Sequence, residues 1–254
     1  MTATRRLCLA LDHEARSGAE NMAVDQTLLD RADQSGAGFL RLYRWAPFCL
    51  SFGRHEPALR RYDRTRIASL GLDVVRRPTG GRAVWHAREL TYSVAAPIAW
   101  FGSLSESYCE IHRLLARALE RLGVPALLAP SERTPNVGSG ACFASPVGGE
   151  VLVHGRKLVG SAQVRQGSAF LQHGSILLAD DQEMVARVTR GEAPASDEIT
   201  LSEALGREVT FSEAADAVTA TLGDDLDLSE APIAPAADPE HLARFRDPAW
   251  TWRR

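Results

Sequence analysis

The spacing of apolar and polar residues predicts two long helices and, nearer the C-terminus, two short ones. Apolar side chains recur with the period of an α-helix over residues 20–33 and 103–122, and glycines follow both segments. The later segments begin at Thr200 and Thr210 with the pattern Thr-x-x-Glu, in which both side chains satisfy N–H groups at a helix start. We therefore expect a short helix after each threonine.

Short β-rich runs separated by turn residues predict a sheet in the earlier part of the chain. The runs cover residues 39–45, 48–53, 73–78, 89–97, 150–163 and 168–179. The run at 150–163 is divided by His154–Gly155, a pair typical of a tight hairpin turn. Turns connect these strands, crossover helices do not, and helices dominate the rest of the chain. This order predicts an α+β fold with a mostly antiparallel or mixed sheet, flanking helices and a small helical C-terminal appendage.

Composition divides the chain into one large domain and a short tail. Residues 1–222 have the length and apolar content to bury a core. Residues 223–240 are acidic and contain proline, a composition typical of linkers. We expect residues 223–254 to form an acidic linker and a tail that packs on the main domain through Trp250 and Trp252.

The net charge of −3 hides an uneven distribution along the chain. Residues 1–100 contain 15 arginines against 10 acidic residues, whereas residues 181–254 contain 7 arginines against 16 acidic residues. The basic part has too little excess charge, and no aromatic pattern, for a nucleic-acid surface. It would suit an acidic protein partner, although solvated faces of opposite charge explain the same counts.

The sequence indicates neither a membrane segment nor a metal site. No apolar run approaches the roughly 20 residues that span a bilayer, and the N-terminus lacks the apolar core of a signal peptide. The four cysteines, Cys8, Cys49, Cys109 and Cys142, have no spacing typical of metal ligands. We expect a cytoplasmic protein with reduced thiols and with no membrane partner, nucleic-acid partner, metal or cofactor.

Lys157 is the single lysine among 29 basic residues. A preference for arginine codons explains the 28 arginines but not the position of the lysine, 15 residues after Cys142 and 16 before His173. Lysine differs from arginine because it can lose its proton and acts as a compact charge. A nearby ammonium lowers a thiol pKa and stabilises an oxyanion, so Cys142 and Lys157 would form a workable pair for acyl transfer. From spacing alone, Cys142 could equally be a buried apolar side chain, as we expect for the other three cysteines.

The segment 76–86, RRPTGGRAVWH, predicts a glycine turn that follows a strand and returns the chain antiparallel. Two glycines let a backbone approach a ligand closely, and arginines beside them supply hydrogen-bond donors. The pattern matches neither a Walker A loop nor a dinucleotide fingerprint, and a structural turn alone would explain the glycines. The candidate substrate-binding residues in this segment are Arg76, Arg77, Gly80, Gly81, Arg82 and His86.

Several motifs resemble, in the same order, those of the biotin/lipoate protein ligase and lipoyl/octanoyl transferase superfamily. They are RRPTGGRAVWHARELTYSV, ACF, GRKLVGSAQ and LQHGSILL, and the resemblance covers roughly residues 18–210. It implies the catalytic-domain fold of that superfamily. It also adds candidate substrate-binding residues from the last two motifs, Gly160, Ser161, His173 and Gly174.

Within the superfamily the motifs are most similar to the LipM-type octanoyltransferase branch. ATP-dependent ligases have a third glycine where this chain has Arg82, and an acidic adenylate motif where it has Cys142 within ACF. Two departures from the branch concern substrate details more than the reaction. Ala87 stands where an aspartate is usual after His86, and residues 147–150 replace an aromatic–acid pair.

The resemblance implies transfer of an octanoyl group from acyl carrier protein to the lysine of a lipoyl domain or a glycine cleavage H-type protein. The acyl group would pass through a thioester on Cys142 without ATP, with Lys157 against the acyl carbonyl. His86 and His173 are both candidates for accepting the proton of the incoming amine. Three alternatives stay open: an ATP-dependent lipoate ligase, an amidotransferase acting between lipoyl domains, and a non-catalytic acyl-binding module.

Overall fold

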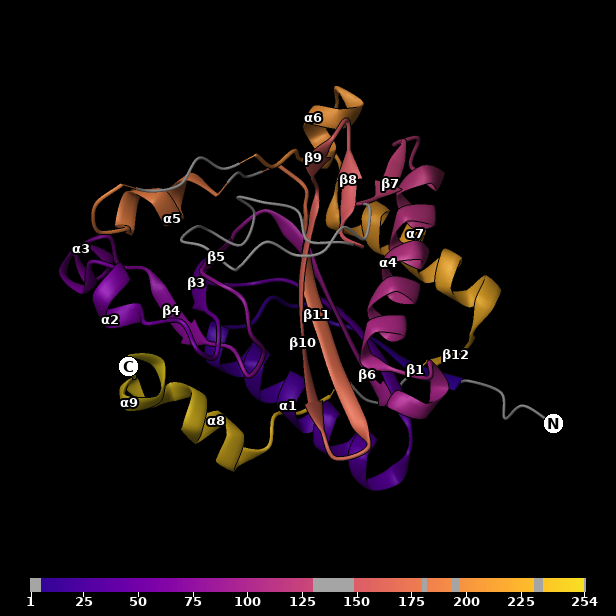
Figure 1. Cartoon of the computed structure of the whole chain (residues 1–254), viewed down its shortest axis with the longest axis horizontal. Coiled ribbons are helices and arrows are strands. Elements are labelled where there is room, and N and C mark those ends of the chain that lie inside the picture. Colours follow the sequence, from indigo (N-terminus) through magenta and orange to yellow (C-terminus); the bar gives the residue numbers. More distant parts are fainter. Residues whose placement is uncertain (1–5, 130–148, 180–181, 193–196, 231–234, 254) are drawn as a thin grey trace.

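The computed structural model describes residues 6–129, 149–179, 182–192, 197–230 and 235–253. Its largest sheet has six strands in the order β10-β11-β6-β2-β1-β12 (Figure 1). β1 runs parallel to both of its neighbours, and the other pairs are antiparallel. This mixed sheet, flanked by helices, confirms the predicted α+β class. The strands are β1 (Arg6–Leu11), β2 (Gly38–Tyr43), β6 (Glu89–Pro97), β10 (Val159–Gln166), β11 (Ala169–Leu177) and β12 (Asp227–Glu230).

Helices cover both faces of this sheet. α1 (Gly18–Ser35) packs on one face, and α4 (Leu104–Arg121) and α7 (Phe211–Asp225) pack against each other on the other face (Figure 1). α1 and α4 are the two long helices that the apolar period predicts. Serines cap both helix starts, and Gly36 ends α1 with a left-handed φ of 70°. Within the described ranges, no helix is both long and apolar enough to cross a membrane.

Two smaller sheets carry the candidate motifs, in the orders β4-β3-β5 and β7-β8-β9. The glycine turn joins β4 to β5. β4 runs parallel to β3 and β5 runs antiparallel to β3, so the turn reverses the chain as predicted. His154 and Gly155 have left-handed φ values of 52° and 77° and join β8 to β9, as the hairpin pattern predicts. The strands are β3 (Cys49–Phe52), β4 (Asp73–Arg76), β5 (Val84–His86), β7 (Ala126–Leu128), β8 (Val151–Val153) and β9 (Arg156–Lys157).

Both predicted capping boxes start helices. The side chains of Thr200 and Thr210 accept hydrogen bonds from the N–H groups of Glu203 and Glu213. The second helix, α7, is longer than the short helix expected there, because apolar side chains continue at helical spacing and pack on α4. The shorter helices are α2 (Ala58–Arg61), α3 (Arg64–Ser69), the 3-10 helix η1 (Ile98–Trp100), α5 (Glu183–Val188) and α6 (Leu201–Leu205).

The start of the acidic segment after residue 222 is not a linker, which corrects the prediction from composition. α7 continues to Asp225, so the expected boundary lies inside this helix. The chain then forms β12, which pairs in parallel with β1. Leu226 and Leu228 alternate with acidic residues, and both pack against the main core. This period of two is a strand signal, which the acidic composition concealed.

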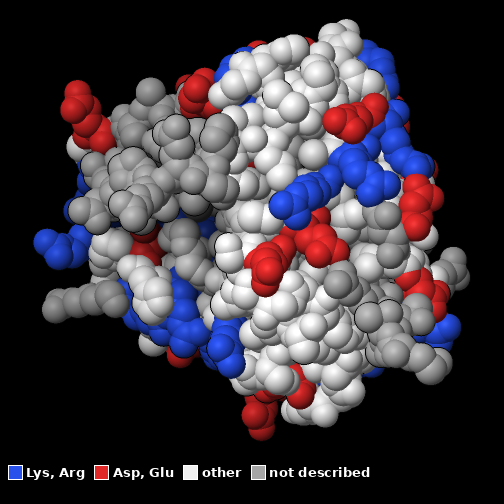
Figure 2. Space-filling model, turned by 45° about the vertical axis from the view of Figure 1, so that its right-hand side comes forward, with Lys and Arg blue, Asp and Glu red and all other residues white. Residues whose placement is uncertain are grey.

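Ion pairs join arginines from earlier in the chain to its acidic last part. Arg6 Nε lies 2.9 Å from Asp227 Oδ2, and Arg121 pairs with Asp224. Figure 2 shows basic and acidic side chains lying side by side on one face of the molecule. Exposed pairs of this kind contribute little stability. They do show that part of the uneven charge along the sequence is neutralised within the fold.

The C-terminal helices α8 (Pro239–Arg246) and α9 (Pro248–Thr251) pack against α1 and β4 (Figure 1). Trp252 is buried against Phe52, with ring centroids 5.3 Å apart. Trp250 Nε1 donates a hydrogen bond of 3.0 Å to the carbonyl of Arg76. The two tryptophans therefore attach the end of the chain to the small sheet that carries the glycine turn.

Replacing Trp252 with alanine should lower the free energy of unfolding by about 3–5 kcal/mol, because a large buried side chain would leave a cavity. Urea unfolding followed by circular dichroism measures this loss. Leu127→Ala is the matched control, since Leu127 is 72% exposed, and its loss should stay within about 0.5 kcal/mol. Equal losses for the two variants would contradict the role of Trp252 as an anchor.

Candidate functional site

Lys157 is buried and paired with a carboxylate. Its Nζ lies 2.6 Å from Glu150 Oε1, and each side chain is only 3% exposed. The backbone of Lys157 is held on both sides, by a hydrogen bond from its N–H to Asp197 O and one from Ile199 N–H to its carbonyl. A buried ion pair is costly to break because the remaining charge would be left without a partner. The ammonium is therefore held in one place at the end of β9.

A chain of hydrogen bonds links β11 to the residue before Glu150. Gln172 Nε2 donates to Tyr92 Oη over 2.9 Å, and Tyr92 Oη lies 2.7 Å from Ser161 Oγ. His112 Nε2 lies 2.8 Å from the same Ser161 Oγ, and His112 Nδ1 lies 2.6 Å from Gly149 O. Because a carbonyl only accepts, Nδ1 carries the proton. In neutral His112, Nε2 then accepts from Ser161, which in turn accepts from Tyr92.

His112 is neutral near pH 7. Burial lowers its pKa from the usual 6.5 to about 4, and the positive charge of Lys157 acts in the same direction. The hydrogen bond to Gly149 opposes this shift but is weaker than the effect of burial. The directions of the bonds from Tyr92 to Ser161 and from Ser161 to His112 therefore follow from one uncharged imidazole.

Acid should destabilise the protein through His112 between about pH 6.5 and pH 4, the interval between its ordinary and its folded-state pKa. In that interval the unfolded chain binds a proton that the folded chain does not, so stability falls as pH falls. The full loss approaches roughly 3 kcal/mol. Urea midpoints of the wild type and His112→Gln should converge as pH falls through this window. The same comparison for exposed His13→Gln is the control, and parallel curves for His112→Gln would contradict the assignment.

Gly174 makes room for the Ser161 hydroxyl. The two residues face each other across the β10–β11 pair. A Cβ on Gly174 would lie 2.4 Å from Ser161 Oγ and 2.6 Å from Gly160 O. Gly160 itself is half-buried and pairs with Ser175. The structure thus gives Ser161 a part in the hydrogen-bond chain and shows that Gly174 leaves space for its hydroxyl, while substrate binding by Gly160, Ser161 and Gly174 stays a prediction.

His173 lies on the opposite face of β11, where it connects α1 to the glycine turn. Its Nδ1 is 2.9 Å from Asp25 Oδ2, and its Nε2 is 2.7 Å from Thr79 Oγ1. Burial raises the pKa of Asp25, but the hydrogen bond from His173 and the charge of Arg41 outweigh it, so the net shift is downward. The Asp25 carboxylate thus accepts the proton on Nδ1, and Nε2 accepts from the Thr79 hydroxyl. Burial also lowers the pKa of His173, which keeps this imidazole neutral.

Asp25 is the centre of a buried polar cluster. Arg41 NH1, Tyr43 Oη and Ser93 Oγ each donate to its carboxylate over 2.9 Å. Arg41 also pairs with Asp12 over 2.7 Å, and its side chain is fully buried. These contacts fix the carboxylate that orients His173, and through it the hydroxyl of Thr79.

Arg77 braces the glycine turn from inside. Its guanidinium donates to the carbonyls of Gly80 and Arg82, over 3.2 Å and 2.7 Å, and to Ser51 O over 3.1 Å. Arg77 is almost fully buried, so these bonds form in a low-dielectric environment. The hydrogen bonds from Arg77 therefore fix the backbone conformation of the turn.

The glycines of the turn serve two different purposes. Gly81 has a left-handed φ of 85°, and its carbonyl approaches Gly53 so closely that a Cβ there would lie 1.9 Å from it. By contrast, a Cβ on Gly80 would meet no described atom within 4 Å. No described residue therefore fills the space beside Gly80, and its role as a backbone wall beside a ligand stays a prediction.

His86 is buried among polar side chains between the β4-β3-β5 sheet and the six-stranded sheet. Its ring stacks on Trp45 at 4.0 Å between centroids, and its Nδ1 lies 2.8 Å from Glu89 Oε1. Its Nε2 lies 2.5 Å from Ser51 Oγ. Both ring nitrogens of His86 and both of His173 therefore have partners within the protein. The role of either ring in accepting the amine proton stays a prediction.

The structure corrects the expectation that Arg76 binds substrate. This side chain is fully buried, and its NH1 donates to the carbonyls of Gly53 and Glu56, each over 2.8 Å. Its Nε and NH2 donate to the carbonyls of Thr251 and Arg253. Arg76 therefore holds the C-terminal segment in place. Arg82, also expected at the site, is half-buried at the end of the turn.

Cys142 lies outside the described residues, but the chain on either side of it is anchored beside Lys157. Ala129 N–H donates to Glu150 O over 2.7 Å, and Gly149 N–H donates to Ala129 O over 2.9 Å. The two described residues that flank the segment containing Cys142, Ala129 and Gly149, thus lie next to Glu150, the ion-pair partner of Lys157. Among the described cysteines, Cys49 is fully buried, and burial together with Asp73 raises its pKa far above the usual value. Its thiol is therefore unsuited to nucleophilic attack.

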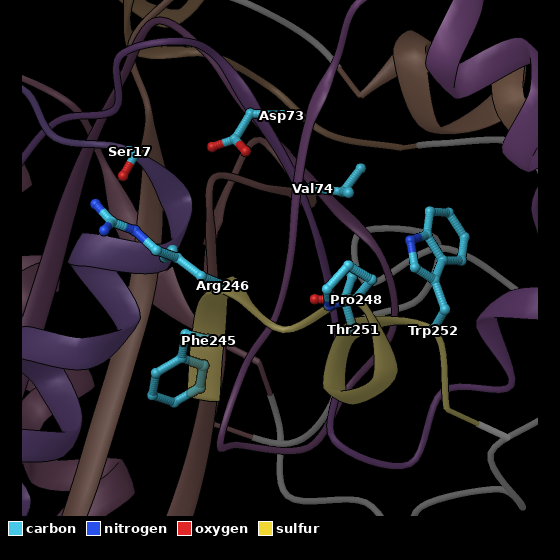
Figure 3. Close-up of a pocket in the computed structure, with 9 residues that line it drawn as sticks. Ser17, Asp73, Val74, Phe245, Arg246, Pro248, Thr251 and Trp252 are labelled. Carbon is cyan, nitrogen blue, oxygen red and sulfur yellow. The ribbon is translucent and has the colours of Figure 1, made fainter. Parts of the chain in front are cut away.

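A pocket of about 300 Å³ lies away from these groups, where the C-terminal helices meet α1 and β4. Figure 3 shows Ser17 and Asp73 on one side of it and Phe245, Pro248 and Trp252 on the other. None of the predicted site residues lines this pocket. It results from the packing of the C-terminal tail.

The structure sorts the described candidate residues into two groups on opposite faces of β11. Lys157, Ser161 and Gly174 adjoin the His112 network, whereas His173 and the glycine turn share the other face. Consecutive strand residues face opposite sides of a sheet, so the His173 side chain points away from the side on which Gly174 leaves room for Ser161. Sequence reasoning missed several residues of these groups: Asp25, Thr79, Tyr92, His112, Glu150 and Gln172. Asp25 and His112 had a usable signal, since each is a polar residue among the apolar positions of a predicted helix.

Comparison with known proteins shows which family this chain resembles. Residues 17–223 match the lipoyl protein ligase A/B catalytic domain family. Octanoyltransferase LipM of Carboxydothermus hydrogenoformans is 43% identical over 184 residues, covering 71% of this chain and 68% of that protein. Octanoyltransferase LipM of Symbiobacterium thermophilum is 39% identical and covers 87% of each chain.

Solved structures agree on the fold. A crystal structure of lipoate-protein ligase A bound with ATP superposes with a TM-score of 0.78 at 20% identity, covering 98% of this chain and 99% of that one. A putative lipoate protein ligase from T. acidophilum, Ta0514, with bound lipoic acid gives the same TM-score at 19% identity, covering 98% of this chain and 100% of that one. The sequence match over most of the chain and the shared fold show that this protein belongs to the lipoyl protein ligase A/B catalytic domain family.

Proposed function

We propose that this protein is an octanoyltransferase that moves an octanoyl group from acyl carrier protein to the lysine of a lipoyl domain. The observation that carries the proposal is the buried Lys157–Glu150 pair, which lies next to Ala129 and Gly149, the described residues on either side of the segment containing Cys142. The similarity to octanoyltransferases over most of the chain supports the same reaction.

The first half-reaction would form a thioester on the enzyme. The Cys142 thiolate attacks the carbonyl carbon of the octanoyl thioester, and the Lys157 ammonium donates to the developing oxyanion. The carbon–sulfur bond to the carrier then breaks, and the carrier leaves as a thiolate. One thioester replaces another, so this step needs no ATP.

The second half-reaction would release the product. The lysine amine of the acceptor attacks the Cys142 thioester, loses a proton to a nearby base, and displaces the cysteine thiolate. The product amide is more stable than the thioester, which draws the reaction forward. His173 would act indirectly, because its hydrogen bond to Thr79 positions the turn, where no described residue fills the space beside Gly80.

The acceptor under this proposal is a lipoyl domain or a glycine cleavage H-type protein. The donor is acyl carrier protein, whose acidic surface would suit the basic first part of the chain. The reaction would take place in the cytoplasm, where scattered cysteines stay reduced.

Intact-mass measurement tests the proposal directly. The protein is mixed with octanoyl-acyl carrier protein in the absence of ATP. We expect an octanoyl adduct that hydroxylamine removes and that maps to Cys142. If no adduct forms, and an acyl-adenylate appears when free octanoate and ATP are added, the protein is a ligase and the proposed mechanism is wrong.

A further inference from the structure

His112 is a fully buried polar side chain near the middle of α4. This helix packs against β8, which begins directly after Glu150, and against β10, which begins two residues after Lys157 (Figure 1). The core residues Ile111 and Leu115 lie beside His112 on the same helix. Burying an imidazole costs free energy that its hydrogen bonds only offset, so an apolar side chain would serve packing alone at least as well.

The Nδ1–H group of His112 holds the peptide group that precedes Glu150. It donates to Gly149 O over 2.6 Å, and that carbonyl belongs to the peptide bond between Gly149 and Glu150. Because a peptide unit is planar, fixing its oxygen also restrains the Glu150 nitrogen. The carbonyl of Glu150 accepts from Ala129 N–H over 2.7 Å. The backbone of Glu150 is therefore held on both sides, and the hold on its N-terminal side comes from α4.

Gly149 has no side chain with which to anchor this peptide group. Its φ of 87° lies in the left-handed region, and glycine has more backbone freedom than any other residue. The chain passes so close to α4 that a Cβ on Gly149 would lie 3.3 Å from Cys109 Sγ. The imidazole of His112 thus restrains the backbone at a residue that is intrinsically free to move.

The Glu150 carboxylate in turn sets the position of the Lys157 ammonium. Glu150 Oε1 lies 2.6 Å from Lys157 Nζ, and both side chains are buried. A lysine has a flexible four-carbon stem, so its backbone alone does not fix Nζ. Burial lowers the pKa of His112 to about 4 and the charge of Lys157 lowers it further, so the two groups are close enough to interact. A neutral imidazole holds Gly149 O without repelling the ammonium.

We propose that His112 is a positioning residue, which keeps the Lys157 ammonium in place by fixing the Gly149–Glu150 peptide group. The inference rests on the proposed function, because it names the group that places the oxyanion donor. His112 would not contact the substrate, since Gly149 and Ser161 occupy both of its ring nitrogens. Its effect would be geometric, because a displacement of about 1 Å in an active site can cost about a hundredfold in rate.

Nuclear magnetic resonance of Lys157 tests this proposal without catalysis. Lys157 is the single lysine of the chain, so lysine labelled with ¹³C and ¹⁵N gives one labelled side chain. We expect His112→Gln to move its Cε and Nζ signals toward those of a solvated lysine, because the glutamine amide lies where Nε2 was and does not reach Gly149 O. His112→Asn should keep the wild-type signals, because the asparagine amide nitrogen takes the place of Nδ1.

Ser107→Ala is the matched control for these variants. Ser107 is also buried on α4, and this change removes its hydrogen bond from Gln163 Nε2, which is 3.1 Å long. The lysine signals of Ser107→Ala should match those of the wild type. Wild-type signals in His112→Gln, or the same displacement in Ser107→Ala, would overturn the proposal. If His112→Gln does not fold, His112→Asn decides, and displaced signals in that variant would overturn the proposal.

Single-turnover formation of the octanoyl adduct measures the catalytic consequence. At saturating octanoyl-acyl carrier protein, His112→Gln should slow this step about a hundredfold, with little change in the donor concentration that gives half the maximal rate. His112→Asn loses only the bond to Ser161 and should stay within about tenfold of the wild type. A loss confined to donor affinity would overturn the positioning role. A wild-type protein that forms no adduct would refute the proposed function, and the lysine signals would still decide whether His112 places Lys157.

Discussion

Replacing Cys142 with alanine should abolish the octanoyl adduct and lower transfer to a lipoyl domain by about 10⁴- to 10⁶-fold. This is the largest effect that we expect. The mechanism has a single nucleophile, and without its thiolate the acyl group cannot leave the carrier. Intact mass reports the adduct, and mass spectrometry of the lipoyl domain reports the transfer. A Cys142→Ala protein that still transfers octanoate would mean that the acceptor lysine attacks the donor directly.

The other cysteines provide the controls for this experiment. Cys8 and Cys109 are partly exposed, so Cys8→Ser and Cys109→Ser should keep both the adduct and the transfer. Cys49 is fully buried, with a pKa raised far above the usual value by burial. Cys49→Ala should therefore affect stability but leave the adduct on Cys142. An adduct that moves to another cysteine in Cys142→Ala would show that the site has been assigned wrongly.

Replacing Lys157 with arginine should lower kcat by about a hundred- to a thousandfold, the typical loss when one oxyanion donor is removed. The charge is retained in this variant, so the loss would come from geometry. Lys157 Nζ lies 2.6 Å from Glu150 Oε1 in a site where both side chains are 3% exposed. A planar guanidinium is larger than an ammonium and cannot occupy the same buried position. Single-turnover rates of adduct formation measure the effect on the first half-reaction.

Stability measurements distinguish a catalytic lysine from a purely structural one. Lys157→Met should cost about 3–5 kcal/mol of unfolding free energy, because it leaves Glu150 charged and buried. The double variant Lys157→Met/Glu150→Gln removes both charges and should recover most of that stability. We expect this double variant to fold but to remain at least about a hundredfold slower than the wild type. Activity within about tenfold of the wild type would show that Lys157 only holds the fold.

Local patterns in the sequence determined much of the architecture. The apolar periods of α1 and α4, and the threonine caps of α6 and α7, depend on residues within four positions of one another. The His154–Gly155 turn likewise needs only two residues with left-handed φ. β12 was not predicted from local patterns. Its acidic, leucine-bearing segment forms a strand because it pairs with the edge of β1. Composition alone favoured a linker.

The candidate site depended on contacts between distant parts of the chain. The single lysine pointed to Lys157, and the glycine pair pointed to the turn. The partners of these groups lie far away in sequence: Ser161 and His112 are 49 residues apart, and His173 and Asp25 are 148 residues apart. Arg76 seemed to belong to a binding motif, but its guanidinium donates a hydrogen bond to the carbonyl of Thr251, 175 residues later in the sequence. A buried donor or charge must find its partner wherever the fold brings one. The sequence alone therefore showed which side chains could do chemistry, and only the tertiary structure decided which of them hold the fold and which border the site.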